Sequence, residues 1–228
     1  MSVVPERFPT SDRSRWMLVG LVAMAFAALA TIAIVDEPAL LRIDRPLQWW
    51  VIGLRQEWID RVMWGITFLG TRWFIGAAVL ALAIWTFLTG RCRVALLVLV
   101  LAFAFNPAIE WALKAGVDRV RPSLLPLGPG RGPSFPSGHV LASVGFYGLL
   151  PMLVPTFGSA SRARIVAAMV GVASILAIGF SRVYIGVHWF TDVVGGLLIG
   201  SVLVAATYAA LRGHRLHGCS RGRCATRS

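Results

Sequence analysis

The stretch Ser181–Asp192 carries an arginine, a histidine and an aspartate between two long apolar runs. His188 and Asp192 are four residues apart, so on a helix their side chains would lie on one face, within reach of each other. A carboxylate beside an imidazole fixes its tautomer, orients the ring and stabilises its charged form. Arg182 adds a planar guanidinium, which suits oxyanions. A base, a group that orients it and an anion-binding cation together indicate phosphate chemistry.

A second polar stretch follows another apolar run. It begins at Lys114 and ends at Arg121, so a cation stands at each end. Glu110 lies one helical turn before Lys114 and could hold it in an i,i+4 ion pair. Taken alone, these cations could also be interfacial side chains that extend to water. Their place at the mouth of the predicted helical bundle is what makes them candidates for binding an anion.

A third stretch, Pro136 to His139, opens the next apolar run after a Pro- and Gly-rich loop. Ser137 is a good helix N-cap, and the free amides of a first helical turn form an anion site. Gly138 would let the backbone approach an oxyanion closely. A plain helix start is the alternative interpretation. His139 and His188 are the only histidines outside the C-terminal tail, and both stand among phosphate-type ligands.

Together, the three stretches resemble the type 2 phosphatidic acid phosphatase superfamily of integral membrane lipid phosphatases. The matching residues are Lys114, six residues, Arg121-Pro122; then Pro136-Ser137-Gly138-His139; then Ser181-Arg182, five residues, His188, three residues, Asp192. Every motif residue and internal spacing is present, in order. The motifs cover residues 114–192, and the expected layout of spans extends the resemblance over most of the chain.

The resemblance implies a role for each motif residue. His188 would attack phosphorus and form a phosphohistidine, Asp192 would orient and charge it, and His139 would protonate the leaving alkoxide. The phosphoryl oxygens would be bound by Lys114, Arg121, Ser137, Gly138 and Arg182. Three cations and a helix N-terminus would balance the charge of about −1.5 to −2 on a phosphate monoester at neutral pH.

We expect no cofactor and no metal ion. The sequence has no acidic cluster suited to a pair of metal ions. The tail contains His214, His217, Cys219 and Cys224, but their spacing does not match a standard zinc site. A flexible basic tail is the interpretation we prefer for this segment.

Composition predicts the fold class. The chain has 228 residues, 57% of them hydrophobic and gathered in long runs, which indicates an all-α, polytopic membrane bundle. A formal net charge of +12 could suggest nucleic-acid binding. Most cations, however, punctuate the ends of apolar runs, which is typical of membrane proteins and argues against a nucleic-acid partner.

Six apolar runs predict transmembrane helices at about 16–35, 73–88, 94–113, 140–154, 165–180 and 193–211. A signal peptide cleaved near Ala28–Ala30 is the alternative for the first run. The Trp-rich stretch 47–69 carries too many charges to span and predicts one or two interfacial helices. The expected organisation is a segment 1–15, one membrane domain 16–211 and a basic tail 212–228.

Arginines predict the orientation of the bundle. The alternate segments 1–15, 89–93, 156–164 and 212–228 hold 3, 2, 2 and 5 arginines, so they should be cytosolic. Both termini would then lie inside a bacterial plasma membrane, and all three motifs would face outward. The opposite orientation is the alternative, because the outward segments also carry ten cations.

The function expected from these observations is phosphate hydrolysis on a lipid phosphate: phosphatidic acid, phosphatidylglycerol phosphate or a polyprenyl pyrophosphate. The only other partners expected are membrane lipids; protein partners are not predicted. One alternative is a transporter or scaffold that binds lipid phosphate without turnover. Intact His139, His188 and Asp192 argue against it, since binding alone needs only the cations. A phosphotransferase that passes the phosphoryl group to an alcohol is a further alternative.

Overall fold

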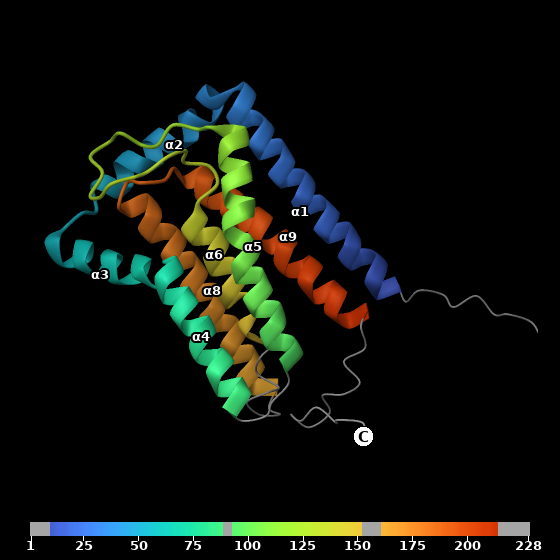
Figure 1. Ribbon diagram of the computed structural model, residues 1–228. Helices are drawn as coiled ribbons and strands as arrows, with labels where there is room; N and C mark the ends of the chain where they lie inside the picture. Colours follow the sequence, from blue (N-terminus) through green and yellow to red (C-terminus); the bar gives the residue numbers. More distant parts are fainter. Residues whose placement is uncertain (1–9, 89–92, 152–160, 214–228) are drawn as a thin grey trace, which may run out of the picture.

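The computed structural model describes residues 10–88, 93–151 and 161–213, and every regular element in these ranges is a helix. Most of the expected N-terminal segment, of the two short basic turns and of the basic tail lies outside the described residues. The helices are α1 (Thr10–Val35), α2 (Glu37–Ile52), α3 (Glu57–Phe68), α4 (Arg72–Leu88), α5 (Arg93–Val117), α6 (Gly138–Tyr147), α8 (Ser161–Tyr184) and α9 (Phe190–Gly213) (Figure 1).

Five of the six expected spans each fall inside one long helix: α1, α4, α5, α8 and α9. Among the described residues, three helices are long and apolar enough to cross a membrane, at Trp16–Val35, Arg162–Tyr184 and Phe190–Tyr208. Helices α3 and α4, bent by 47° at a short break, could form a fourth span. The membrane-embedded, all-helical bundle is therefore confirmed, whereas the count of six spans stays a prediction.

The expected span 140–154 takes a different form. Helix α6 starts as expected but ends at Tyr147, and residues 152–154 lie outside the described part of the chain. Seven of its ten side chains are buried, and it packs against α4, α5, α8 and α9. A helix that is apolar all round is a core helix when other helices surround it. Helix α6 is therefore the central helix of the bundle.

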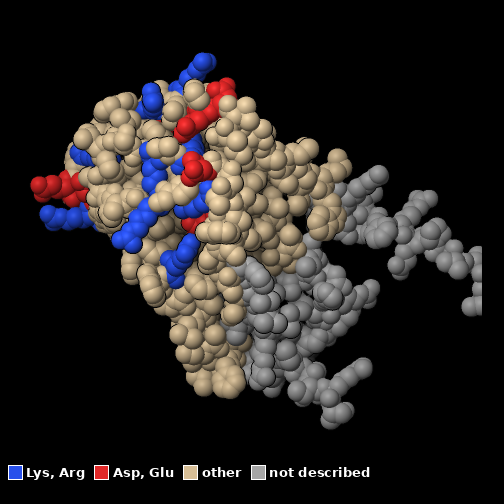
Figure 2. All heavy atoms as spheres, turned by 45° about the horizontal axis from the view of Figure 1, so that its top comes forward, with Lys and Arg blue, Asp and Glu red and all other residues tan. Residues whose placement is uncertain are grey.

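Large apolar side chains cover the outside of the bundle. Exposed examples lie on α1, α4 and α8, among them Trp16, Leu21, Leu80, Phe87 and Met169. A protein in water rarely exposes a continuous apolar surface of this kind. On the face shown in Figure 2, charged side chains gather towards one end of the molecule, and the lower flank is free of them.

The charged end is built from α2, α3, the loop 118–137 and the connection 185–189, whereas the first residues of α1 and the last of α9 lie at the other end (Figure 1). Residues 37–45, which precede the Trp-rich stretch, form the first half of α2. Asp36 caps that helix, since its Oδ1 accepts from the Ala39 amide at 3.2 Å.

The Trp-rich stretch 47–69 forms the second half of α2 and all of α3. Its four tryptophans, Trp49, Trp50, Trp58 and Trp64, are exposed, as an interfacial position requires.

Close packing of α9 on α6 depends on glycines in α9. A Cβ atom at Gly200 would lie 2.7 Å from Cβ of Val144. We therefore expect Gly200→Leu to lower the free energy of unfolding by about 1–3 kcal/mol, the usual cost of overpacking. Gly20→Leu on α1, where an added Cβ meets nothing within 4 Å, is the matched control. Thermal unfolding in detergent measures both; equal midpoints would contradict the packing described here.

Candidate active site

Backbone hydrogen bonds bring the three sequence motifs together at the charged end of the bundle. The Ser137 amide donates to the Asp192 carbonyl at 3.0 Å, which joins the start of α6 to the start of α9. The Ser134 amide donates to the Arg119 carbonyl at 2.7 Å and folds the loop back on the end of α5. The motif residues therefore converge on one site, although 78 positions separate Lys114 from Asp192 in the sequence.

His188 lies at the centre of this site and is almost fully buried. Its Nδ1 is 3.6 Å from Oδ2 of Asp192, and its Nε2 is 3.2 Å from Nη1 of Arg121. The expected neighbourhood is present, but the two residues do not share a helix. His188 stands in the turn after Gly186, whose φ is +79°, and only Asp192 belongs to α9.

The environment of His188 favours its neutral form. Burial lowers the pKa of the imidazole well below its ordinary value. The charges of Arg182, Arg121 and Lys114 lower this pKa further. Because Arg121 can only donate, Nε2 of a neutral ring accepts from it and Nδ1 carries the proton on the side of Asp192. The lone pair of Nε2 therefore points to the cationic side of the site.

Asp192 is held by a buried arginine that the sequence did not mark as functional. Nη1 of Arg119 donates to Oδ1 of Asp192 at 2.7 Å, and Nη2 donates to Oδ2 of Asp44 at 2.7 Å. All three side chains are fully buried. The Trp189 amide donates to the other oxygen of Asp192 at 2.8 Å. These hydrogen bonds fix the Asp192 carboxylate independently of its contact with His188.

Asp44 connects α2 to this arrangement. Its Oδ1 accepts from the Thr191 amide at 3.0 Å, so the start of α9 is anchored to α2. Local spacing gave no signal for this contact, because Asp44 is 147 residues from Thr191 and 75 from Arg119. In the sequence, Asp44 is one of several charged residues that precede the predicted interfacial stretch 47–69, and nothing there indicates that it is buried.

Arg121 organises the loop as well as facing His188. Its guanidinium donates to the carbonyls of four residues of the loop and of the 185–189 connection: Arg131 (3.0 Å), Gly132 (2.9 Å), Pro133 (3.1 Å) and Val187 (2.5 Å). It is therefore rigidly positioned before any ligand binds.

Arg182 and Ser137 present donors without partners. Nη1 of Arg182 donates to Oγ1 of Thr67 at 2.8 Å, but its Nε is buried without a hydrogen bond among the described residues. Ser137 occupies the N-cap position of α6 as expected, yet its Oγ makes no capping bond and is also unpartnered. Buried polar atoms are normally paired, so these atoms are candidates for contact with a ligand.

Lys114 and Gly138 meet at the carboxylate of Glu110. The expected ion pair is confirmed, with Nζ of Lys114 at 2.9 Å from Oε1 of Glu110. The same carboxylate lies against Gly138, where a Cβ atom would collide with it. His139 follows on the first turn of α6, and its ring lies beside Gly70, from the break between α3 and α4.

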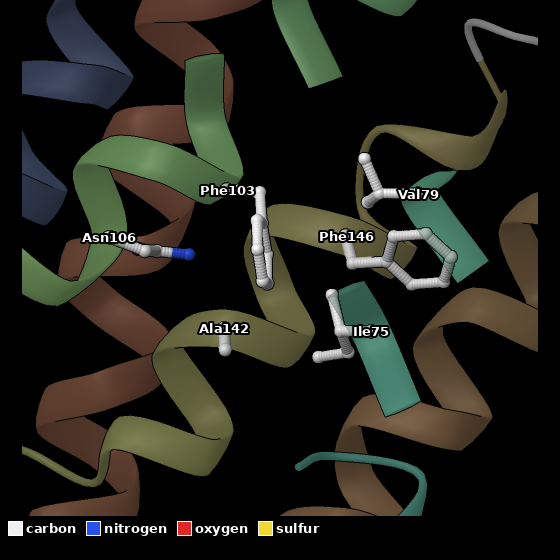
Figure 3. Close-up of a pocket in the computed structure, with 7 residues that line it drawn as sticks. Ile75, Val79, Phe103, Asn106, Ala142 and Phe146 are labelled. Atoms are coloured by element: carbon white, nitrogen blue, oxygen red, sulfur yellow. The ribbon is translucent and has the colours of Figure 1, made fainter. Parts of the chain in front are cut away.

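A pocket between α4, α5 and α6 lies elsewhere (Figure 3). Apolar side chains line it, apart from the amide of Asn106, and about 180 Å³ inside it is free of atoms. Ligand sites usually offer roughly 300–1,000 Å³, and none of the motif residues lines this one. We assign it to the packing of the three helices.

Taken together, the site is a buried imidazole with a fixed carboxylate on one side and Arg121 on the other. Nearby, Arg182 and Ser137 have buried polar atoms without partners. Such a set can bind an oxyanion and attack it with nitrogen. Within the described residues, no group of three or more His, Cys, Asp or Glu side chains is arranged to hold a metal ion.

Known proteins are similar to this chain in sequence and in architecture. The family described as the PAP2 superfamily matches residues 94–215. Phosphatidylglycerophosphatase B of Bacillus subtilis (strain 168) is 32% identical over 184 residues, which cover 80% of this chain and 90% of that protein.

Two solved structures are also similar. The crystal structure of a transmembrane PAP2-type phosphatidylglycerolphosphate phosphatase from Bacillus subtilis has a TM-score of 0.78 at 27% identity, and the match covers 86% of this chain and 96% of that one. Aquifex aeolicus LpxE, at 22% identity, shares the fold with a TM-score of 0.59 over 73% of this chain and 95% of its own.

The buried network predicts a large loss of stability when Arg119 is changed. Arg119→Gln leaves Asp44 and Asp192 without their counter-ion, and breaking a buried ion pair costs about 3–5 kcal/mol. Arg45→Gln, on the exposed side of α2, removes the same charge and should change little. Thermal unfolding of both variants in detergent tests this; an Arg119→Gln protein as stable as Arg45→Gln would refute the network.

Proposed function

The chain belongs to the PAP2 superfamily, and from this membership and the geometry of its site we propose a specific activity. It hydrolyses the terminal phosphate of a membrane lipid, with phosphatidylglycerol phosphate as the preferred substrate and a phosphohistidine at His188 as the intermediate. Membership makes the protein a phosphoric monoester hydrolase embedded in a membrane. The sequence relative and the solved structure from Bacillus subtilis are both named for phosphatidylglycerophosphate, which supports this substrate over phosphatidic acid or a polyprenyl pyrophosphate.

One observation carries the proposed mechanism: the imidazole of His188 lies between Asp192 and Arg121. Nε2 keeps its lone pair on the side where Arg121, Arg182 and Lys114 would hold the phosphoryl oxygens. When Nε2 bonds to phosphorus, the ring becomes cationic, and Asp192 stabilises that charge at Nδ1. The geometry thus supports attack by nitrogen better than simple anion binding.

In the first step, Nε2 attacks phosphorus while the bond from phosphorus to the leaving oxygen breaks, and His139 gives that oxygen a proton. In the second step, water attacks phosphorus, His139 takes its proton, and the P–N bond breaks to release inorganic phosphate. Burial lowers the pKa of His139 far below its ordinary value, and the charges of Arg182, Lys114 and Arg72, and of His188 when it is protonated, lower it further. A bound phosphate neutralises these cations, so we infer that His139 becomes an acid only with substrate in place.

We also propose that the site faces the outside of the cell. The charged end, with all three motifs, lies opposite the described ends of α1 and α9 (Figure 1). This supports an arrangement in which both termini share one side of the membrane and the site occupies the other. The arginine bias of the alternate segments then favours cytosolic termini.

The proposed activity predicts metal-independent phosphate release that depends on His188. Purified protein in mixed micelles with EDTA should release phosphate from phosphatidylglycerol phosphate faster than from phosphatidic acid or a polyprenyl pyrophosphate. His188→Ala should abolish release while unfolding at the same temperature as the unmodified protein. Phosphate release by the His188→Ala protein would contradict the mechanism. Loss of activity in EDTA would show that a metal ion is needed.

His139→Ala should separate the two histidine roles. Without its acid, the enzyme should lose about 10²–10⁴-fold on an alkyl phosphate and far less on p-nitrophenyl phosphate, whose leaving group needs no proton. Labelled phosphate should then accumulate on His139→Ala protein as an acid-labile, alkali-stable adduct, because hydrolysis also slows. Equal losses on both substrates would contradict the assignment. Formation of the phosphate ester of an added alcohol would indicate a phosphotransferase.

The lowered pKa of His188 predicts how activity depends on pH. Attack requires the neutral imidazole, so the acid limb of kcat/KM should lie below pH 6.5. Arg121→Gln removes one of the charges that disfavour the imidazolium, so the pKa of His188 should rise and the limb should move to higher pH. Ionisation of the substrate is the same for both proteins, so the difference between their profiles isolates the enzyme. A limb that stays in place would contradict this account.

A further inference from the structure

Arg72 belongs to none of the three motifs, yet it shares a carboxylate with one of their residues. Nη2 of Arg72 pairs with Oε2 of Glu110, whose other oxygen is 2.9 Å from Nζ of Lys114. The Arg72 side chain is 55% exposed, compared with 17% for Lys114 and 12% for Glu110. Arg72 therefore stands at the open rim of the site, one carboxylate away from a phosphate-binding cation.

Glu110 occupies a position suited to an anion. Its carboxylate lies against Gly138, at the N-terminus of α6, and between two cations. Helix N-termini and paired cations are features of phosphate sites. In the absence of a ligand, the carboxylate is the counter-ion of Arg72 and Lys114.

Arg72 stands on the side where the leaving group must lie. It begins α4, two residues after Gly70, and Gly70 packs against the ring of His139. The charge of Arg72 acts on the pKa of His139, the residue we assign to protonation of the leaving oxygen. A negative group carried by the leaving part of the substrate would therefore meet Arg72.

The charge of the site leaves room for such a group. Four cations face it, namely Arg72, Lys114, Arg121 and Arg182. The buried group of Arg119, Asp44 and Asp192 contributes −1, so the site carries +3 once Glu110 is displaced. A phosphate monoester brings only about −1.5 to −2. A second phosphate on the same substrate would supply the remaining negative charge.

We propose that Arg72 forms a second phosphate subsite, for a phosphate linked to the one that is hydrolysed. Glu110 is its displaceable counter-ion, and the preferred substrates carry two phosphates, as phosphatidylglycerol phosphate and polyprenyl pyrophosphates do. The inference rests on the proposed function and deepens it. It explains substrate choice by one side chain outside the three motifs.

The test compares Arg72→Gln with unmodified protein on phosphatidylglycerol phosphate and phosphatidic acid of identical acyl chains. A charge-assisted hydrogen bond lost only with the first substrate should lower its kcat/KM about tenfold or more, with a change of about twofold for phosphatidic acid. Arg61→Gln is the matched control, since Arg61 on α3 is 82% exposed and 3.7 Å from Glu57. Arg72→Lys should restore much of the lost selectivity.

Assays of Arg72→Gln on a polyprenyl pyrophosphate show which separation of the two phosphates the subsite accepts. A loss of kcat/KM with this substrate as well means that both separations are recognised. Equal losses on phosphatidylglycerol phosphate and phosphatidic acid would overturn the inference, because Arg72 would then serve only to hold Glu110. No loss on any substrate would overturn it too. If the unmodified protein releases phosphate from none of the three lipids, the proposed function itself fails, and the inference fails with it.

Discussion

The site depends on one buried charge, the guanidinium of Arg119 between Asp44 and Asp192. Buried carboxylates are tolerated only when they are paired and hydrogen-bonded, and a neutral imidazole could not compensate Asp192. Arg119 donates one hydrogen bond to each carboxylate, both at 2.7 Å. Because its partners come from α2 and α9, the same contact fixes α2 over the end of the bundle. The contacts of Arg119 therefore serve both to position His188, the proposed nucleophile, and to hold the helices in their arrangement.

This network also divides the charge around His188. Arg119, Asp44 and Asp192 together carry −1 behind the imidazole, with the partly exposed Glu37 at 3.5 Å from Nε of Arg119. Arg121 stands on the other side of the ring, with its Nη1 at 3.2 Å from Nε2 of His188. In the proposed reaction, an incoming phosphoryl group would meet positive charge, and the ring that becomes cationic would have negative charge behind it. Fixed groups would serve both needs without reorganisation at the moment of attack.

Motif spacing predicted most of the site, because the spacing records which residues must meet at the end of a bundle. Five long helices were predicted for a similar reason, since each is a continuous apolar run. Three features escaped prediction. Arg119 looked like one more loop cation, since its partner Asp44 is 75 residues away. Helix α6 ends at a turn at Gly148 and Leu149, inside the apolar run, and the turn at Gly186 puts His188 outside α9.

Glu110 shows why an acidic side chain belongs in a site built for anions. Without a ligand, Arg72 and Lys114 would repel each other in a partly buried setting, where Coulomb energies are stronger than in water. A carboxylate between them lowers that repulsion and keeps both cations in place. Gly138 permits this, since any larger residue would displace the carboxylate from the start of α6. The carboxylate therefore stabilises this arrangement of cations, and its proposed exchange for phosphate would reduce binding energy but preserve the geometry that catalysis needs.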